Sequence, residues 1–340
     1  MKKRLFAGLM ASALMVSMLA GCSSQPAASD EGGASAEGGS GDGYNMTLIM
    51  ALRDEFLSSM EAGAIAAAEE LGVNLTTQDA QNDTSKLIQY IESAANAGED
   101  AVIVNMVDPE TAQQCIDAAG DMKVVFVNRP PTDTSILTES AVYVGSDEMQ
   151  AGGYQAEFLA NYFKEQGKTE ISYILLNGTI GNVSTTNRTA SCLQGLEEAG
   201  ITATEAAAPL VADFDRATAM DMIAPLLTTV DYDCIISNND AMALGAIEAM
   251  TAAGLDPASI PIVGVDATAD GRQAIKDGTL AMSVFQDPDG QGRGCLIAAA
   301  NLLEGKAINE GTEYDLDEEN SNIMWVPFEP VTAENVADYD

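Results

Sequence analysis

The chain has 340 residues, of which 46% are hydrophobic and 5% aromatic, and its formal net charge is -37. This length favours two domains over one core, and the hydrophobic content excludes a chain that is disordered throughout. The acidic excess argues against nucleic-acid binding, because phosphate backbones would be repelled. The absence of histidine excludes catalysis by an imidazole and removes the commonest metal ligand.

Residues 1–21 have the composition of a secretory signal: a basic start, an apolar run too short to favour a membrane span, and small residues at the end. The segment leads into LAGC, which ends at Cys22 and resembles a bacterial lipobox, and this implies lipidation of Cys22. Residues 22–44 are rich in Gly, Ser, Ala and Glu and are expected to form a flexible tether. We therefore expect a lipid-anchored protein on the extracytoplasmic face of the cell membrane, periplasmic where an outer membrane exists.

From Met46 onward, strand patterns and helix patterns alternate. Apolar runs rich in β-branched residues predict the first strands, at 47–52, 73–77, 101–105, 123–128 and 141–145. Segments with helical periodicity predict the helices between them, at 56–71, 84–97 and from Pro109 onward. Regular alternation of this kind predicts a parallel sheet with helices on both faces.

A second series of the same kind follows. Strands are expected at 171–176, 202–207, 234–237, 262–265, 281–286 and 324–327. Helices are expected at 149–163, 187–199, 216–227, 270–277 and 290–303, and another directly after the strand at 234–237, where Asp240 is expected to be the N-cap. Residues 177–186 read as a polar loop. The fold class predicted is α/β, with two similar, doubly wound parallel-sheet lobes.

Polar side chains recur where these strands end. They are Asp54, Asn105, Asn128, Asn239, Asp266 and Gln286. Because ligands bind at the carboxyl ends of parallel strands, their recurrence in both half-chains predicts one cleft between two sheets. Arg188 and the rings of Phe56 and Phe214 lie beside these loops in the sequence. Carboxylates, amides and a guanidinium bind hydroxyl groups, and flat rings stack on the C–H face of a sugar, so the set suits an uncharged polyol or sugar.

Other chemistries fit the sequence less well. Asp54 and Asp266 could form the carboxylate pair of a glycosidase, but their amide and arginine neighbours favour hydrogen bonding over a raised carboxyl pKa. The sequence has neither GxxxxGKS nor a GxGxxG that follows a strand, so nucleotide binding is not indicated. Four further cysteines, none at metal-ligand spacing, are expected to be buried apolar residues. They are Cys115, Cys192, Cys234 and Cys295.

Several segments, in order and spacing, resemble the type I periplasmic binding proteins and especially their glucose/galactose-binding members. The segments are Asp79–Lys86 (DAQNDTSK), Asn105–Pro109 (NMVDP), Val124–Asn128 (VVFVN), Tyr143–Asp147 (YVGSD), Asn238–Ala246 (NNDAMALGA) and Ile260–Ala267 (IPIVGVDA). The resemblance runs from about Met46 to Phe328. It implies two hinged lobes that close on a monosaccharide and deliver it to an ABC permease, with no cofactor and no catalysis.

The resemblance also implies that the chain crosses between the lobes three times, at 145–146, 286–287 and 323–326. The first lobe would then comprise residues 45–145 and 287–324, and the second 146–286 and 325–340. We expect a monomer whose partners are the monosaccharide, the permease subunits and, through the anchor, the membrane.

Carried over by motif, the resemblance implies the ligand contacts. They are Asp54, Phe56, Asn128, Asn182, Ser184, Arg188, Phe214, Asn239, Asp266 and Gln286, with Asn105 as a further candidate. Phe214 stands in place of a stacking tryptophan, and Gln286 in place of an asparagine. Asn182 and Ser184 replace a histidine and an aspartate that read the sugar in the glucose/galactose-binding members, so the choice between these sugars is open. The stretch 164–171 lacks the alternating acids of the calcium loop in those members, so no calcium is expected.

Two alternatives concern function. The same fold could present a sugar to a chemoreceptor or to a sensor-kinase ectodomain, or could bind a pentose or another small polyhydroxylated ligand. A sugar-responsive repressor would need a helix-turn-helix before Met46, where the sequence has a signal and a tether instead. The sequence does not specify the sugar or its anomer, nor whether the cell has one membrane or two.

Overall fold

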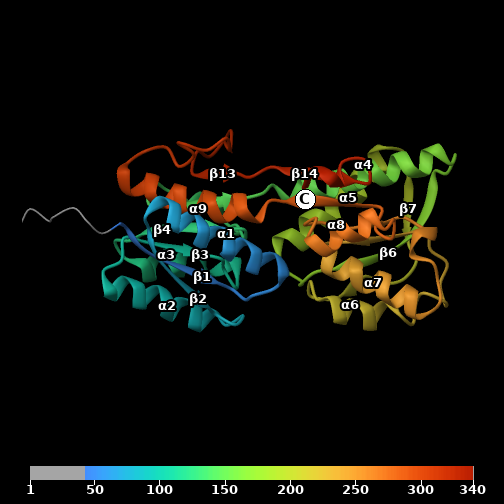
Figure 1. Ribbon diagram of the computed structural model, residues 1–340, viewed down its shortest axis with the longest axis horizontal. Coiled ribbons are helices and arrows are strands. Elements are labelled where there is room, and N and C mark those ends of the chain that lie inside the picture. Colours follow the sequence, from blue (N-terminus) through green and yellow to red (C-terminus); the bar gives the residue numbers. More distant parts are fainter. Residues whose placement is uncertain (1–42, 340) are drawn as a thin grey trace, which may run out of the picture. The chain divides into compact units, whose positions relative to one another are not determined.

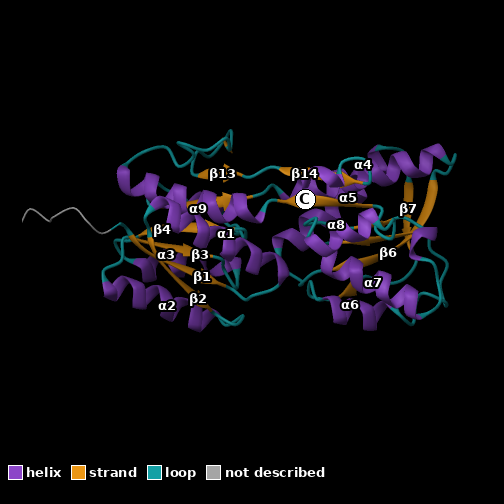
Figure 2. Cartoon of the chain, viewed as in Figure 1, coloured by secondary structure: helices purple, strands orange, loops and turns teal. Residues whose placement is uncertain are grey.

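The computed structural model describes residues 43–339, so the predicted signal, Cys22 and nearly all of the predicted tether lie outside the described residues. In the described part, helices and strands alternate along the chain and build two α/β lobes that belong to one compact unit (Figures 1 and 2). Among residues 43–339, none of the helices combines the length and the hydropathy that a membrane span requires. The predicted fold class is confirmed.

The sheet of the first lobe has the strand order β12-β13-β5-β4-β3-β1-β2, and only β12 runs antiparallel to its neighbour. The strands are β1 (Asn45–Met50), β2 (Asn74–Asp79), β3 (Ala101–Val104), β4 (Lys123–Val127), β5 (Ala141–Gly145), β12 (Asp315–Leu316) and β13 (Ile323–Trp325). β3 and β5 are buried along their whole length, as expected for parallel strands that helices cover on both faces.

The sheet of the second lobe has the order β14-β11-β10-β9-β6-β7, and β8 also pairs with β6. The strands are β6 (Glu170–Asn177), β7 (Thr202–Glu205), β8 (Leu210–Val211), β9 (Cys234–Ser237), β10 (Ile262–Val263), β11 (Met282–Gln286) and β14 (Phe328–Thr332). β14 is the antiparallel edge strand and pairs only with β11. It was not predicted as a strand, because it contains Pro330 and exposed Glu329. Proline is accepted on a sheet edge, where one side of the strand needs no ladder partner.

Helices cover both sheets. They are α1 (Glu55–Leu71), α2 (Thr84–Ala97), α3 (Ala112–Ala119), α4 (Glu148–Glu165), α5 (Val183–Glu198), α6 (Arg216–Ile223), α7 (Asp240–Ala252), α8 (Ala269–Lys276) and α9 (Pro288–Glu304). Short 3-10 turns lie at Pro109–Thr111, Thr134–Ile136, Pro257–Ser259 and Val336–Tyr339. Most of the helices begin after an Asp, Asn or Thr whose side chain accepts a backbone N–H, which satisfies a donor that the helix itself leaves free.

Within the described residues, the chain passes between the two sheets three times. It leaves the first sheet after β5 and enters α4 of the second lobe, and it returns between β11 and α9. The third passage joins β13, in the first sheet, to β14, in the second. Each passage is only a few residues long, so a small change of backbone angles there could move one lobe as a body.

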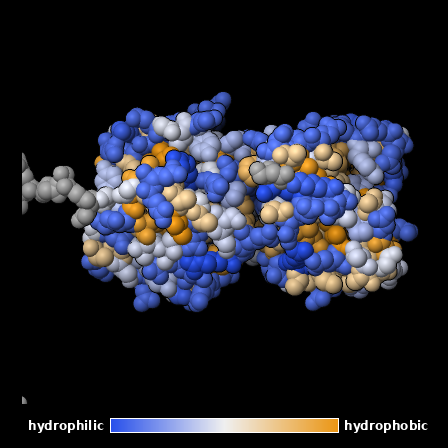
Figure 3. Space-filling model, in the orientation of Figure 1, coloured by the Kyte–Doolittle hydropathy of each residue, from blue (hydrophilic) through white to orange (hydrophobic). Residues whose placement is uncertain are grey.

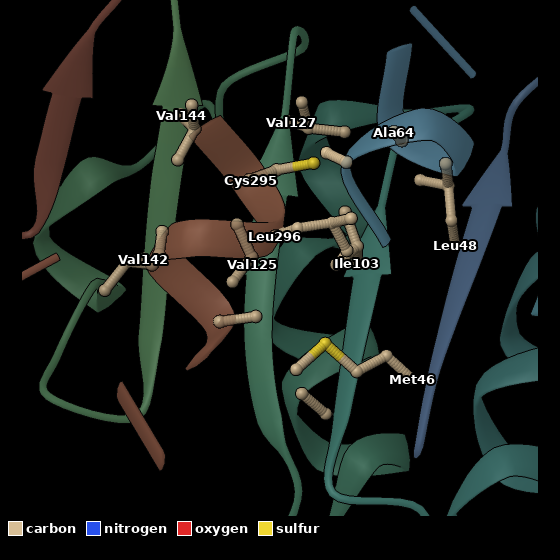
Figure 4. Packing of buried hydrophobic residues seen from close by; sticks show 14 of the residues in the cluster. Met46, Leu48, Ala64, Ile103, Val125, Val127, Val142, Val144, Cys295 and Leu296 are labelled. Carbon is tan, nitrogen blue, oxygen red and sulfur yellow. The ribbon is translucent and has the colours of Figure 1, made fainter. Parts of the chain in front are cut away.

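The core of the first lobe shows why these elements pack together. Met46, Leu48 and Met50 alternate along β1 and face the helices α1 and α9, whereas Ile49 faces the opposite layer with α2 and α3. Figure 4 shows the helix that carries Cys295 and Leu296 lying over side chains of β3, β4 and β5. The four cysteines of residues 43–339 are buried, as predicted, and all four are free. The face of the molecule shown in Figure 3 is largely hydrophilic, in keeping with the acidic composition.

Candidate ligand-binding site

A cavity lies where strand ends of both lobes meet, which is the usual place for a small-molecule site in an α/β protein. It is lined by Asp54, Phe56, Leu57, Asn128, Arg129, Asn182, Ser184, Arg188, Phe214, Asn239, Asp266 and Gln286. The structure thus brings together all of the predicted contacts except Asn105. Leu57 and Arg129 were not predicted, although Arg129 directly follows the VVFVN strand and a strand-end search could have included it.

On the first-lobe wall, Asp54 and Arg129 form an electrostatic pair. The carboxylate of Asp54 caps α1 and accepts the Leu57 N–H at 2.7 Å. Burial raises the pKa of Asp54, and the capping bond and Arg129 oppose this shift. Burial lowers the pKa of Arg129, and Asp54 opposes that shift in turn. Nη1 of Arg129 donates to the Met106 carbonyl at 2.9 Å, which fixes the guanidinium against the cavity wall.

On the second-lobe wall, Arg188 is held by a carboxylate that the sequence analysis missed. Nε of Arg188 donates to Oε2 of Glu148 at 2.6 Å and Nη2 donates to Oε1 at 3.2 Å, and both side chains are almost fully buried. Ser184 donates its hydroxyl to Oε1 of Glu148 at 2.7 Å. Glu148 is the first residue of α4, where an acid is usually explained by the helix dipole, so its sequence position gave no sign of a role in the site.

The same guanidinium reaches three other groups of the wall. Nη1 donates to the Asn238 carbonyl at 2.8 Å, Nη2 donates to Oε1 of Gln286 at 3.1 Å, and Oδ1 of Asp266 lies 3.8 Å from Nη1. Burial lowers the pKa of Arg188, but Glu148 and Asp266 outweigh it and raise that pKa above its ordinary value. Arg188 is therefore a charged, fully positioned group. Nε2 of Gln286 is buried without a protein partner and is free to donate to a ligand.

Two expectations about helix starts are wrong. α5 begins at Val183 rather than at residue 187, because Asn182 is its N-cap and accepts the Ser184 N–H at 2.8 Å. α7 is capped by Asn239 rather than by Asp240: Oδ1 of Asn239 accepts the Met242 N–H at 3.0 Å. In both asparagines the oxygen serves the helix, so what remains for a ligand is mainly the amide donor.

Asn105 does not line the cavity. Its side chain is fully buried, accepts the Ala51 N–H at 3.2 Å, and donates to the Val127 carbonyl at 3.2 Å and to Oδ1 of Asn128 at 3.4 Å. Strand-end position alone could not separate this role from ligand contact, because a residue after a parallel strand can face either the cavity or the neighbouring strand.

Backbone strain is concentrated at this cavity. Asn128, Phe214 and Asp266 have positive φ angles of 66°, 63° and 110°. Such conformations persist where the surroundings hold them in place, and they gather at functional sites. The ring of Phe214 lies directly against Gly178: a β-carbon on Gly178 would lie 2.0 Å from the phenyl ring, so only glycine allows the ring to take this position.

The carboxylate of Asp240 stabilises the turn that carries Asp266 through hydrogen bonds. Oδ1 of Asp240 accepts the Ser283 hydroxyl at 2.6 Å, and Oδ2 accepts the Thr268 N–H at 2.9 Å. Ser283 in turn accepts the Ala267 N–H at 3.0 Å, so the residues on the C-terminal side of Asp266 are fixed to α7. Burial raises the pKa of Asp266 well above its ordinary value, and Arg188 opposes this shift.

Asp240 makes the stability of the protein depend on pH. Burial raises its pKa from 3.8 to about 7, although the bonds from Ser283 and Thr268 oppose this. The folded state therefore holds the proton more tightly than the unfolded state, and stability is lost as pH rises from about 4 to about 7. We expect the free energy of unfolding of the wild type, relative to Asp240→Asn, to fall by about 2 kcal/mol between pH 5 and pH 7. Urea unfolding of both proteins measures this, and a difference that is constant with pH would contradict it.

Comparison with known proteins gives a consistent result. A sequence model described as a periplasmic binding protein domain matches residues 47–307. A candidate rhizopine-binding protein of Rhizobium meliloti is 32% identical over 290 residues, 84% of this chain and 89% of that protein. The D-galactose/methyl-galactoside binding periplasmic protein MglB of Haemophilus influenzae is 33% identical over 301 residues, 84% of this chain and 88% of that protein.

Solved structures agree with the sequence comparisons. An ABC transporter solute binding protein from Bacillus halodurans, with bound myo-inositol, superimposes with a TM-score of 0.74 at 28% identity, over 88% of this chain and 98% of that chain. Within residues 43–339, no group of three or more His, Cys, Asp or Glu side chains is placed to hold a metal ion.

Proposed function

The chain belongs to the periplasmic binding protein family, and we propose that it captures a monosaccharide, or a ring polyol of similar size, in the cavity between its lobes. Members of this family are non-enzymatic, extracytoplasmic substrate-binding components of ABC transporters. The glycosidase alternative is therefore rejected for this chain.

The observation that carries the proposal is the convergence of two carboxylates and two rings from opposite lobes on one cavity. Asp54 and Phe56 come from the first lobe, and Asp266 and Phe214 from the second. Carboxylates accept hydrogen bonds from hydroxyl groups, and aromatic rings pack against the C–H groups of a pyranose or a cyclitol. The donors are supplied by amides and by Arg129 and Arg188, so neither a strongly anionic nor a strongly apolar ligand is matched as well.

Three ligand classes are supported by specific observations. The relative MglB binds galactose and methyl-galactoside, which supports a galactose- or glucose-like ligand. The Bacillus halodurans protein is bound to myo-inositol, which supports a cyclitol. Asn182 and Ser184 favour retuned selectivity, because the Asn182 oxygen caps α5 and the Ser184 hydroxyl donates to Glu148. A relative described as a ribose import binding protein supports a pentose as a third class.

We propose that binding closes the two lobes about the three passages, and that the closed form is presented to an ABC permease. A ligand shifts this equilibrium only if it binds the closed form more tightly, which contacts from both walls would provide. We also propose that lipidated Cys22 anchors the protein at the extracytoplasmic face of the membrane. Presentation of the closed form to a chemoreceptor or a sensor kinase is compatible with the same binding step.

A thermal-shift panel on residues 44–340 tests the proposal. D-galactose, D-glucose, D-ribose, D-xylose and myo-inositol would be compared, with sodium chloride and mannitol as controls. A compound that binds only the folded state stabilises it by about 2.7 kcal/mol at a hundredfold excess over its Kd. We expect one cyclic compound to raise the Tm by several degrees. If none of the cyclic compounds does so more than mannitol, the proposed ligand class is wrong.

A further inference from the structure

A chain of buried amides leads from the cavity to the passages between the lobes. The Ala51 N–H donates to Oδ1 of Asn105 at 3.2 Å, and Nδ2 of Asn105 donates to Oδ1 of Asn128 at 3.4 Å. Nδ2 of Asn128 then donates to Oε1 of Gln291 at 3.2 Å, and Nε2 of Gln291 donates to the Ser146 hydroxyl at 3.0 Å. This series of hydrogen bonds begins at the end of β1 and reaches the segment between β5 and α4.

The donor-to-acceptor direction of these hydrogen bonds is fixed by the Ala51 N–H. A backbone N–H can only donate, so the Asn105 amide must turn its oxygen toward Ala51 and its nitrogen toward Asn128. The same reasoning then sets the orientation of the Asn128 amide, and of Gln291 after it. One N–H of the Asn128 amide bonds Gln291, and the second N–H remains available as a donor to the cavity that Asn128 lines. Its oxygen already accepts from Asn105.

Ser146 and Gln291, at the end of this series of hydrogen bonds, lie beside two of the passages between the lobes. Ser146 follows β5 in the first passage between the lobes, and Gln291 lies in the first turn of α9, directly after the second passage. Gln291 is fully buried and Ser146 is 2% exposed, so water does not compete for these bonds. Tyr143 adds a second constraint, because its hydroxyl donates to the Asn128 carbonyl at 3.0 Å and so supports the strained backbone there.

We propose that Gln291 is a positioning residue for ligand selection: it holds Asn128 in the orientation that presents a donor, and it ties that orientation to the first passage. This rests on the proposed function of the cavity. Gln291 itself does not line the cavity. The ligand class that the arrangement selects has a hydroxyl oxygen or ring oxygen, a hydrogen-bond acceptor, facing Asn128.

The test compares three variants. Gln291→Met keeps length and volume but removes both hydrogen bonds. Gln291→Glu keeps an acceptor for Asn128, and the rotatable Ser146 hydroxyl can donate to it. Asn301→Leu is the matched control: Asn301 is a buried amide on the same helix, and it bonds the carbonyls of Ile308 and Glu310 at 3.3 and 2.9 Å, away from the cavity. Each protein would be titrated calorimetrically with D-galactose and with myo-inositol.

For a sugar that binds the wild type, we expect Gln291→Met to weaken binding roughly fivefold, about 1 kcal/mol, because Asn128 must be ordered on binding. Gln291→Glu should lose less, and Asn301→Leu should bind as the wild type does. An unchanged affinity in Gln291→Met, or an equal loss in Asn301→Leu, overturns the proposal.

Amide hydrogen exchange of the ligand-free proteins separates this proposal from the proposed function. Gln291→Met should exchange faster at residues 126–130 and 144–148 than the wild type, and Asn301→Leu should not. If neither D-galactose nor myo-inositol binds the wild type, the exchange measurement alone tests the positioning role of Gln291. Faster exchange at these two segments supports the positioning role, whereas wild-type exchange there overturns it.

Discussion

Glu148→Ala is expected to lower the free energy of unfolding by about 3–5 kcal/mol, because it removes the nearer partner of a buried ion pair and leaves Arg188 with only the carboxylate of Asp266, 3.8 Å away. The guanidinium of Arg188 would lose two charge-assisted bonds, and the Ser184 hydroxyl would lose its acceptor. Urea unfolding followed by circular dichroism measures the change. Ligand affinity should fall as well, since Arg188 would no longer be held in the cavity wall.

Two comparisons show whether the ion pair is the cause. Glu157→Ala removes an exposed glutamate from the same helix and should change stability by less than about 0.5 kcal/mol. The double variant Glu148→Ala/Arg188→Met removes both charges of this pair and should recover part of the lost stability, because only Asp266, 3.8 Å from Arg188, then loses a charged partner. A double variant no more stable than Glu148→Ala alone would contradict this explanation.

Asp266→Asn is expected to weaken ligand binding by about 1.5–3 kcal/mol, or roughly 10- to 150-fold, since it replaces a charged acceptor by a neutral one. Asparagine is the suitable substitution because, like aspartate, it tolerates the positive φ of 110° at this position. The unliganded protein should not lose stability at pH 7. Burial raises the pKa of Asp266, so its ionised form costs the folded state free energy as pH rises.

Calorimetric titration and urea unfolding of the same preparations check both parts of this prediction. Asp277→Asn, at the exposed C-terminal end of α8, is the matched control and should bind the sugar as the wild type does. An Asp266→Asn protein with wild-type affinity would remove Asp266 from the binding site.

Much of the fold was predictable because its signals are local. Runs such as Ala101–Val104 are buried on both faces and read as parallel strands, and the alternation with periodic helices indicates two lobes. β14 was missed because its stability comes from pairing with β11 rather than from its own sequence. The two mistaken helix starts have one cause: a cap depends on backbone angles at one residue, and neighbouring Asn, Asp, Ser and Thr residues are equally suited to it.

Most residues that line the cavity could be predicted, because they follow strand ends or match motifs of the family. Arg129 could have been named from its position after a strand, but Glu148 and Gln291 were missed because they act through contacts between segments far apart in the chain. Glu148 and Arg188 are 40 positions apart, and Asn128 and Gln291 are 163 apart. Nothing in one sequence marks such pairs. For Asn105 the position was right, but only the packing of β1, β3 and β4 shows that its amide bonds the backbone.

We expect one ligand to be bound between the two lobes by the cavity residues. Amide hydrogen exchange with and without D-galactose or myo-inositol, whichever raises the Tm, tests it most directly. We expect the ligand to protect backbone amides in loops of both lobes, at residues 52–57, 128–130, 182–188, 212–215, 238–240 and 264–268. Protection confined to one lobe, or located away from these loops, would contradict it.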